Sequence, residues 1–307
     1  MTVGVTAKAQ GRDDVARRCS LDGSAVKANL DCLPCFLTQG LKAARLCVPE
    51  DEDLHRRLLQ NWAARLADMD ISHSPPAIAG ELYRDVEAML GNGDPFQADK
   101  KRANARVREL LPRLQSIVTS SIDPLARALE ISIIGNYIDS GVAREFSWEE
   151  ELEHEARDLD REVYARFCQA IEAHKEVMIL GDNAGEIALD TILVRQLQER
   201  GCTVTYVVRG SPIINDATMD DAHEVGMTGL CRVVSSGVDT PGTVLSRCNQ
   251  EFLEMFKHSP VVLSKGQGNL EALADECPGL FYALKIKCPV VAELTGLPVG
   301  RSALMLL

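Results

Sequence analysis

Four short apolar runs in the second half of the chain each end in a group of polar residues and glycines. These groups occupy residues 181–186, 209–216, 265–269 and 285–287. Carboxylate and amide oxygens suit a hard divalent cation that keeps some of its waters and shares its charge with a phosphate. Lysines and the backbone N–H groups of glycine-rich turns suit the phosphate itself. Together the four groups predict a site for a metal ion and a phosphorylated ligand.

The candidate metal ligands are Asp182, Asn183 and Asp216, because each offers a side-chain oxygen shortly after a strand-like run. Asp182 and Asp216 are also the candidates for orienting or activating a nucleophile. Lys265 and Lys287 are predicted to be catalytic, because they would neutralise charge on the phosphoryl oxygens. The other polar side chains of these loops are candidates for substrate binding: Glu186, Arg209, Gln267 and Asn269.

Each of the four groups also has a purely structural interpretation. The sequence GDNAG at 181–185 is typical of a turn with a helix cap, and Asn215 and Asp216 suit a cap as well. The sequence KGQGN at 265–269 is not a Walker motif and suits a tight turn before a helix. Lys285 and Lys287 share one strand face, which suits a solvent-exposed strand end. The recurrence of four such groups at equivalent places is what favours a site.

The strand-like runs alternate with helix-like stretches, and this pattern predicts a mostly parallel sheet flanked by helices. In such sheets the loops beyond the carboxyl ends of the strands meet at one edge, where ligands bind. We therefore expect a three-layer α/β/α, Rossmann-like domain at residues 151–307. The strand-like runs are EVMILG, VTYVVR, CRVVSS, PVVLS and LFYALKIK.

The first half of the chain has a different period. Apolar residues recur at helical spacing from about residue 24 to about residue 140, as in Leu54, Leu58 and Trp62. This half is predicted to form a helical bundle. The expected organisation is a flexible tail at 1–22, a helical domain at 23–150 and the α/β domain at 151–307.

Composition narrows the classes of partner. The 307 residues include 33 basic and 45 acidic side chains, and the resulting net charge of -12 disfavours nucleic acid. No apolar run reaches the roughly 18 residues that span a bilayer, and the N-terminal residues lack the apolar centre of a secretory signal. We expect a cytoplasmic protein with no membrane partner and with most of its ten cysteines reduced.

Cys32 and Cys35 form a C-x-x-C pair at the start of an amphipathic, helix-like stretch. We expect them to pack in the core and not to be catalytic. A redox pair, or a structural metal site shared with Cys288, are the alternatives for these thiols.

Three common site motifs are missing from the sequence. No G-x-G-x-x-G follows the first strand-like run of the second half, which argues against a dinucleotide fold. The absence of a G-x-S-x-G elbow argues against an α/β-hydrolase. The absence of an H-E-x-x-H pair argues against a histidine-based zinc site.

The same loops, in the same order, resemble those of the damage-control phosphatase family, which includes acidic-residue methyltransferase-like proteins. The resemblance extends over nearly the whole chain after the tail, and the Cys pair with Lys287 and Cys288 resembles the prokaryotic branch. Outside the four loops it rests on CLPC at 32–35, DPF at 94–96 with Lys100 and Asn104, and GNYID at 135–139.

This resemblance implies a helical domain packed on an α/β domain, with one divalent metal at Asp182, Asn183 and Asp216. It implies hydrolysis of small phosphoesters, such as sugar phosphates or phosphopantetheine-like esters, supported by Mg, Mn, Co or Ni. Asn136 and Asp139 would come from the helical domain to close the cleft and bind the substrate.

Two mechanisms and two other functions stay open at this point. Metal-assisted attack of water on phosphorus is one mechanism, and attack by Asp182 to give an aspartyl-phosphate is the other. One alternative function is S-adenosylmethionine-dependent methylation of protein carboxyl groups, although Arg209 stands where such a site would want an acidic residue. The other is a non-catalytic module that binds a metal or a metabolite.

Overall fold

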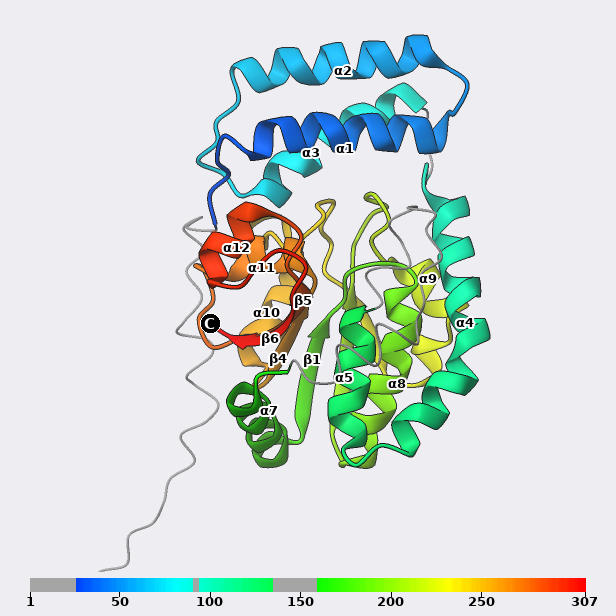
Figure 1. Cartoon of the computed structure of the whole chain (residues 1–307), viewed down its shortest axis with the longest axis vertical. Helices are drawn as coiled ribbons and strands as arrows, with labels where there is room; N and C mark the ends of the chain where they lie inside the picture. Colours follow the sequence, from blue (N-terminus) through cyan, green and yellow to red (C-terminus); the bar gives the residue numbers. More distant parts are fainter. Residues whose placement is uncertain (1–25, 91–93, 135–158) are drawn as a thin grey trace, which may run out of the picture.

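The computed structural model of the chain describes residues 26–90, 94–134 and 159–307 (Figure 1). Two predicted substrate-binding residues, Asn136 and Asp139, lie outside the described residues, and so does the predicted domain boundary near residue 150. Among the described helices, none has the length and apolar composition needed to span a bilayer.

A six-stranded sheet forms the centre of the molecule, in the order β3-β2-β1-β4-β5-β6. The first five strands are parallel to one another, and β6 pairs antiparallel with β5. This sheet confirms the predicted α/β class. The strands are β1 Glu176–Leu180, β2 Thr203–Val208, β3 Arg232–Ser235, β4 Val262–Lys265, β5 Phe281–Lys285 and β6 Ser302–Leu306.

Strand β1 shows why these runs are continuously apolar. Its last four residues are all buried, and they alternate between two cores. Val177 and Ile179 belong to the core on one face of the sheet, whereas Met178 and Leu180 belong to the core on the other. A parallel strand with both faces covered needs apolar residues at every position.

Strand β6 is not among the predicted strands. Its sequence, SALML, is rich in residues that favour helices. It is a strand because its backbone pairs with β5, from Phe281 opposite Leu306 to Lys285 opposite Ser302.

The helices of one sheet face include two from the first half of the chain. Helices α4 (Gln97–Thr119) and α5 (Pro124–Ile134) both pack on α8 (Glu186–Glu199), and α7 (Arg161–His174) lies on the same face. The short helix α9 (Met219–Glu224) contributes to the same core. Helices α4 and α5 therefore share the core of the sheet instead of a core of their own.

The opposite face of the sheet is covered by helices α10 (Gln250–His258), α11 (Gln267–Leu273) and α12 (Pro289–Thr295). Phe252 and Phe256 of α10 stack with their ring centroids 5.5 Å apart and fill much of this core. The three layers are thus helices, sheet and helices.

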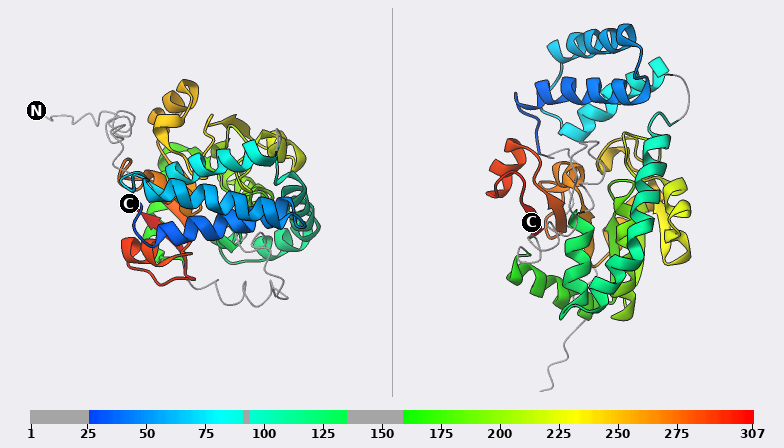
Figure 2. Two further views of the ribbon diagram at one scale, coloured as in Figure 1. Left: turned by 90° about the horizontal axis from the view of Figure 1, so that it is seen from above. Right: turned by 45° about the vertical axis from the view of Figure 1, so that its right-hand side comes forward.

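Helices α1 (Cys32–Cys47), α2 (Glu52–Ala67) and α3 (Pro75–Leu90) pack around a third core. They lie across one end of the molecule, next to the carboxyl ends of the strands (Figures 1 and 2). Trp62 of α2 packs so closely on Gly40 of α1 that a Cβ there would lie 2.5 Å from the indole ring. This three-helix layer faces the loops that carry the predicted site.

Candidate active site

The loops after β1 and β2 are joined by backbone hydrogen bonds. The Ala184 N–H donates to the Asn215 carbonyl at 2.8 Å, and the Ala217 N–H donates to the Asp182 carbonyl at 2.8 Å. Asn183 and Asp216 form an isolated antiparallel bridge. The backbone therefore brings together the three predicted metal ligands, which come from loops far apart in the sequence.

The side chains of Asp182, Asn183 and Asp216 are all buried, and the Asn183 amide donates to the Asp182 carboxylate at 2.9 Å. Neither aspartate caps a helix. Helix α8 begins after Gly185 with no side-chain cap, and α9 is capped by Thr218. The helix-cap interpretation of these residues is therefore wrong.

Arg209 lies between the two carboxylates. Its Nε donates to Asp216 Oδ2 at 2.6 Å, and its Nη2 lies 3.5 Å from Asp182 Oδ1. The other terminal nitrogen, Nη1, donates to Thr243 Oγ1 at 3.1 Å and to Asn269 Oδ1 at 3.0 Å.

Arg209 is 3 % exposed, yet its Nη2 has no hydrogen-bond partner among the described residues. A buried donor of this kind is costly unless a ligand or ordered water accepts from it. The Arg209 Nη2, which lacks a hydrogen bond, therefore indicates where an oxygen-bearing ligand could bind.

The charges of Asp182 and Asp216 favour binding of a cation between them. Burial raises the pKa of Asp216 to about 7; Arg209 opposes this effect and the negative charge of Asp182 adds to it. Two adjacent carboxylates carry two negative charges, and the single guanidinium between them balances only one. Within the described residues no three His, Cys, Asp or Glu side chains form a metal-binding group, so an ion here would use two carboxylates and the Asn183 amide.

The loop after β4 approaches the Asp182 carboxylate closely. Gly266 has a φ of +78°, and a Cβ at this position would collide with Asp182 Oδ2. Asn269, fully buried, donates to the carbonyls of Gly181 and Lys265 at 3.1 and 2.8 Å. Asn269 thus holds the β1 and β4 loops together while its oxygen accepts from Arg209.

Lys265, a predicted catalytic residue, is completely buried and is engaged by carboxylates. Its Nζ contacts Glu186 Oε1 and lies 3.1 Å from Asp190 Oδ1. Burial opposes the charge on Lys265, but Asp190 and Glu186 outweigh it and raise the pKa of the lysine. Tyr206 donates to the other Asp190 oxygen at 2.7 Å, so this ammonium belongs to a closed internal network.

The loop after β5 places its two lysines differently. Lys287 is exposed, whereas Lys285 is 7 % exposed, and burial together with Lys287 lowers the pKa of Lys285 to about 8. Gln267 accepts from the Lys287 backbone N–H at 2.8 Å and donates to Glu271 at 2.8 Å. Gln267 therefore links the β4 and β5 loops.

Lys100 and Asn104 of α4 support the site, although residue chemistry alone did not single them out. Lys100 Nζ lies 2.8 Å from both Asp94 and Asp221, and 3.5 Å from the Asp216 carbonyl. The Asn104 side chain accepts from the Gly185 N–H at 2.7 Å. The available signal was the four-residue spacing, which puts both polar side chains on one face of the helix.

The two cysteines of the C-x-x-C pair differ in exposure. Cys32 is buried in the core of α1–α3, and burial raises its pKa, whereas Cys35 is exposed. Both are free thiols in the structure. Core packing is therefore confirmed for Cys32 alone, because Cys35 is exposed.

The sequence model of the Damage-control phosphatase ARMT1-like domain matches residues 28–303, a span that contains the candidate site. The chain belongs to this family. A damage-control phosphatase of Archaeoglobus fulgidus is 33% identical over 279 residues, covering 88% of this chain and 95% of the relative. A damage-control phosphatase of Pyrococcus horikoshii is 30% identical over 287 residues, covering 91% and 98% respectively.

A solved structure agrees with these sequence relatives. The crystal structure of a DUF89 family protein from Pyrococcus horikoshii matches this chain with a TM-score of 0.80 at 29% identity, covering 91% of this chain and 99% of that chain. The resemblance to the damage-control phosphatases is thereby confirmed for the family and for the fold.

Proposed function

We propose that this damage-control phosphatase family member is a metal-dependent hydrolase of small phosphomonoesters. The observation that carries the proposal is the Nη2 of buried Arg209, which makes no hydrogen bond within the described residues although it lies 3.5 Å from Asp182 Oδ1 and beside Asp216. A phosphate oxygen would satisfy this donor, and a cation would offset the two carboxylates. The names of the curated relatives support a phosphatase.

Asp182, Asn183 and Asp216 would hold the ion, which we expect to be Mg, Mn, Co or Ni. Oxygen donors from two carboxylates and an amide suit such ions. A divalent cation bound there would stabilise negative charge on the phosphoryl group.

The protein's own groups would position the reactants. Arg209 Nη2 would donate to a phosphoryl oxygen, while the Nε bond to Asp216 and the Nη1 bond to Asn269 hold the guanidinium in place. Asp182 or Asp216 would orient the attacking water and accept its proton. Direct attack by Asp182 is the alternative: its carboxylate oxygen would bond to phosphorus as the alkoxide leaves, and water would then attack phosphorus and free the carboxylate. The two routes differ at phosphorus, because one displacement by water inverts its configuration and two successive displacements retain it.

The substrates we propose are small phosphorylated metabolites, such as sugar phosphates or phosphopantetheine-like esters. Lys287 is exposed just after β5, and there it would meet an incoming anion. Lys265 and Glu186 would act by positioning the loops, since both side chains are buried and contact each other. Asn136 and Asp139 stay predicted contributors outside the described residues.

Replacement of Asp182 by Asn tests the proposal. Asp182→Asn keeps the side-chain volume and its oxygen, but removes one charge from the ligand set. We expect phosphate release to fall about a hundredfold or more, which corresponds to about 2.7 kcal/mol of barrier. The stabilisation that added metal gives wild type in thermal unfolding should also be lost.

The assay would use a panel of phosphomonoesters with each of the four metals, on wild type, Asp182→Asn, Asp216→Asn and Asp220→Asn. The last variant is the control, because Asp220 is exposed and lies only four residues beyond Asp216. Wild-type activity and metal response in Asp182→Asn would refute the proposed function.

A further inference from the structure

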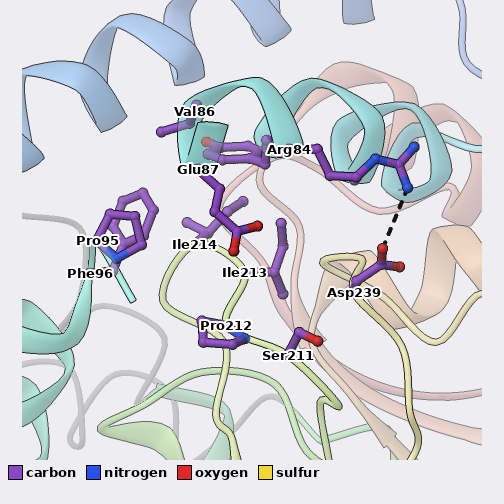
Figure 3. Close-up of a pocket in the computed structure, with 12 residues that line it drawn as sticks. Arg84, Val86, Glu87, Pro95, Phe96, Ser211, Pro212, Ile213, Ile214 and Asp239 are labelled. Carbon is purple, nitrogen blue, oxygen red and sulfur yellow. Dashed lines mark hydrogen bonds and ion pairs between the residues drawn. The ribbon is translucent and has the colours of Figure 1, made fainter. Parts of the chain in front are cut away.

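A cavity of about 150 Å³ lies between α3 and the loop after β2 (Figure 3). Aromatic and aliphatic side chains line it on both sides, while its polar groups come mainly from α3. A cavity of about this volume is large enough for a six-membered ring. Its apolar lining includes Tyr83, Phe96, Ile213 and Ile214.

Two chain segments connect this cavity to the candidate active site. The Asp216 N–H donates to the Ile213 carbonyl at 3.0 Å, so the cavity wall and the metal ligand belong to one turn. The Phe96 carbonyl accepts from the N–H of Lys100, whose ammonium lies 3.5 Å from the Asp216 carbonyl. A ligand that fills the cavity therefore lies next to the turn that holds Asp216.

Ile214 of this turn has a backbone conformation that is unusual for its residue type. Its φ is +47°, in the left-handed region that β-branched residues rarely adopt. Such a conformation costs on the order of 1–3 kcal/mol, and it persists at sites where the surrounding structure needs it. Here it lets one short turn present a cavity wall at Ile213 and the carboxylate at Asp216.

Three charged residues line the cavity: Arg84, Glu87 and Asp239. Figure 3 shows the Glu87 carboxylate directed toward Ile213 and Ile214. The part of the chain that the structure describes provides it with no hydrogen bond or ion pair, whereas Arg84 is paired with Asp239 at 3.5 Å. Asp239 is also paired with Arg247. Glu87, which is exposed, is thus the charged lining residue that has no ionic partner among the described residues.

We propose that this cavity binds the alcohol part of the phosphomonoester, and that Glu87 selects alcohol parts that are neutral or cationic over those that carry a second negative charge. The inference rests on the proposed function. An apolar ring or short chain would pack between Tyr83, Phe96 and Ile213, with a hydroxyl or ammonium donating to the Glu87 carboxylate.

The test uses three phenyl phosphates that differ only in the para substituent: hydroxymethyl, carboxylate or aminomethyl. We would measure kcat/KM for each on wild type, Glu87→Gln and Glu87→Lys. Each comparison is made between variants for the same substrate, so that differences in leaving-group reactivity cancel.

With Glu87→Gln, kcat/KM for the carboxylate substrate should rise about fivefold relative to the hydroxymethyl substrate, and for the aminomethyl substrate it should fall by a similar factor. A change of this size is expected for a charge pair that is partly exposed to water. Glu87→Lys should shift both ratios further in the same directions. Glu81→Gln is the matched control, because Glu81 is exposed on the same helix but outside the cavity.

Unchanged ratios in both Glu87 variants, with wild type active, would overturn the inference and leave the proposed function standing. The inference would also be overturned if Glu81→Gln changed the kcat/KM ratios between substrates as much as Glu87→Gln does. Such a result would reflect the general charge of α3. Absence of turnover in wild type with every substrate and metal would refute the proposed function and the inference together.

Discussion

Gly266 and Asp182 follow neighbouring strands and lie in close contact. This contact leaves no space for a side chain at position 266. The backbone at Gly266 has a φ of +78°, and a Cβ would meet the Asp182 carboxylate. Glycine satisfies both conditions because it lacks a Cβ and adopts positive φ at no steric cost. The residue following Lys265 is therefore constrained by the site as well as by the turn.

Gly266→Ala should lower activity more than it lowers stability. The backbone penalty should be about 1–2 kcal/mol, but the new methyl group must also displace the Asp182 carboxylate. Gly201→Ala is the control, because Gly201 has a φ of +80° and a Cβ there would have nothing within 4 Å. Both variants should lose stability in chemical denaturation through the backbone penalty, while only Gly266→Ala should also lose at least about tenfold in rate. Equal activity in the two variants would contradict a role for this contact.

At the scale of elements, the Lys265 network joins four parts of the fold. Lys265 ends β4, Glu186 and Asp190 belong to α8, and Tyr206 belongs to β2. The carbonyl of Ser132 on α5 accepts from the same ammonium at 3.2 Å. A buried charge costs several kcal/mol unless it is paired, so each of these elements depends on the lysine.

Lys265→Met should destabilise the protein by about 3–5 kcal/mol, because it leaves Glu186 and Asp190 buried without their cation. Adding Glu186→Gln to the same chain should restore part of that loss, since it removes one of the uncompensated carboxylates. Urea denaturation of the single and double variants would measure both effects. If Lys265→Met kept wild-type stability and lost only activity, Lys265 would instead act directly on the phosphate, as residue type alone predicts.

At the scale of the whole molecule, α3 joins the three-helix layer to the α/β part. A Cβ at Gly80 would lie 2.5 Å from Thr240 Cγ2, and a Cβ at Gly242 would lie 2.9 Å from Pro76 Cβ. These small residues let the helix lie directly on the loop that follows β3. This contact between α3 and the loop after β3 also forms one side of the cavity that contains Glu87.

Gly80→Ala should destabilise the protein by about 1–3 kcal/mol through overpacking, although glycine to alanine within a helix ordinarily stabilises. Thr240→Ser in the same chain should recover most of this loss. Serine lacks the methyl group that clashes but keeps the hydroxyl that donates to the Gly242 carbonyl at 2.7 Å. Thermal unfolding of the two single variants and the double variant would measure the recovery. No recovery in the double variant would show that the methyl contact is not the cause.

Much of the fold and the centre of the site could be predicted from the sequence. The five parallel strands were predictable because a strand covered on both faces must be apolar throughout, and that requirement is local. The convergence of Asp182, Asn183 and Asp216 was predictable because the carboxyl ends of parallel strands share one edge. Residue type and order were sufficient for both.

Only the tertiary structure decided which partners the polar residues have. Lys265 looked like a phosphate-binding cation, but its neighbours are Glu186 and Asp190. Strand β6, the packing of α4 on α8 and the cavity under α3 likewise depend on contacts between distant segments. Local periodicity indicates that a residue is buried, whereas its role depends on which charged or apolar groups the rest of the chain places against it.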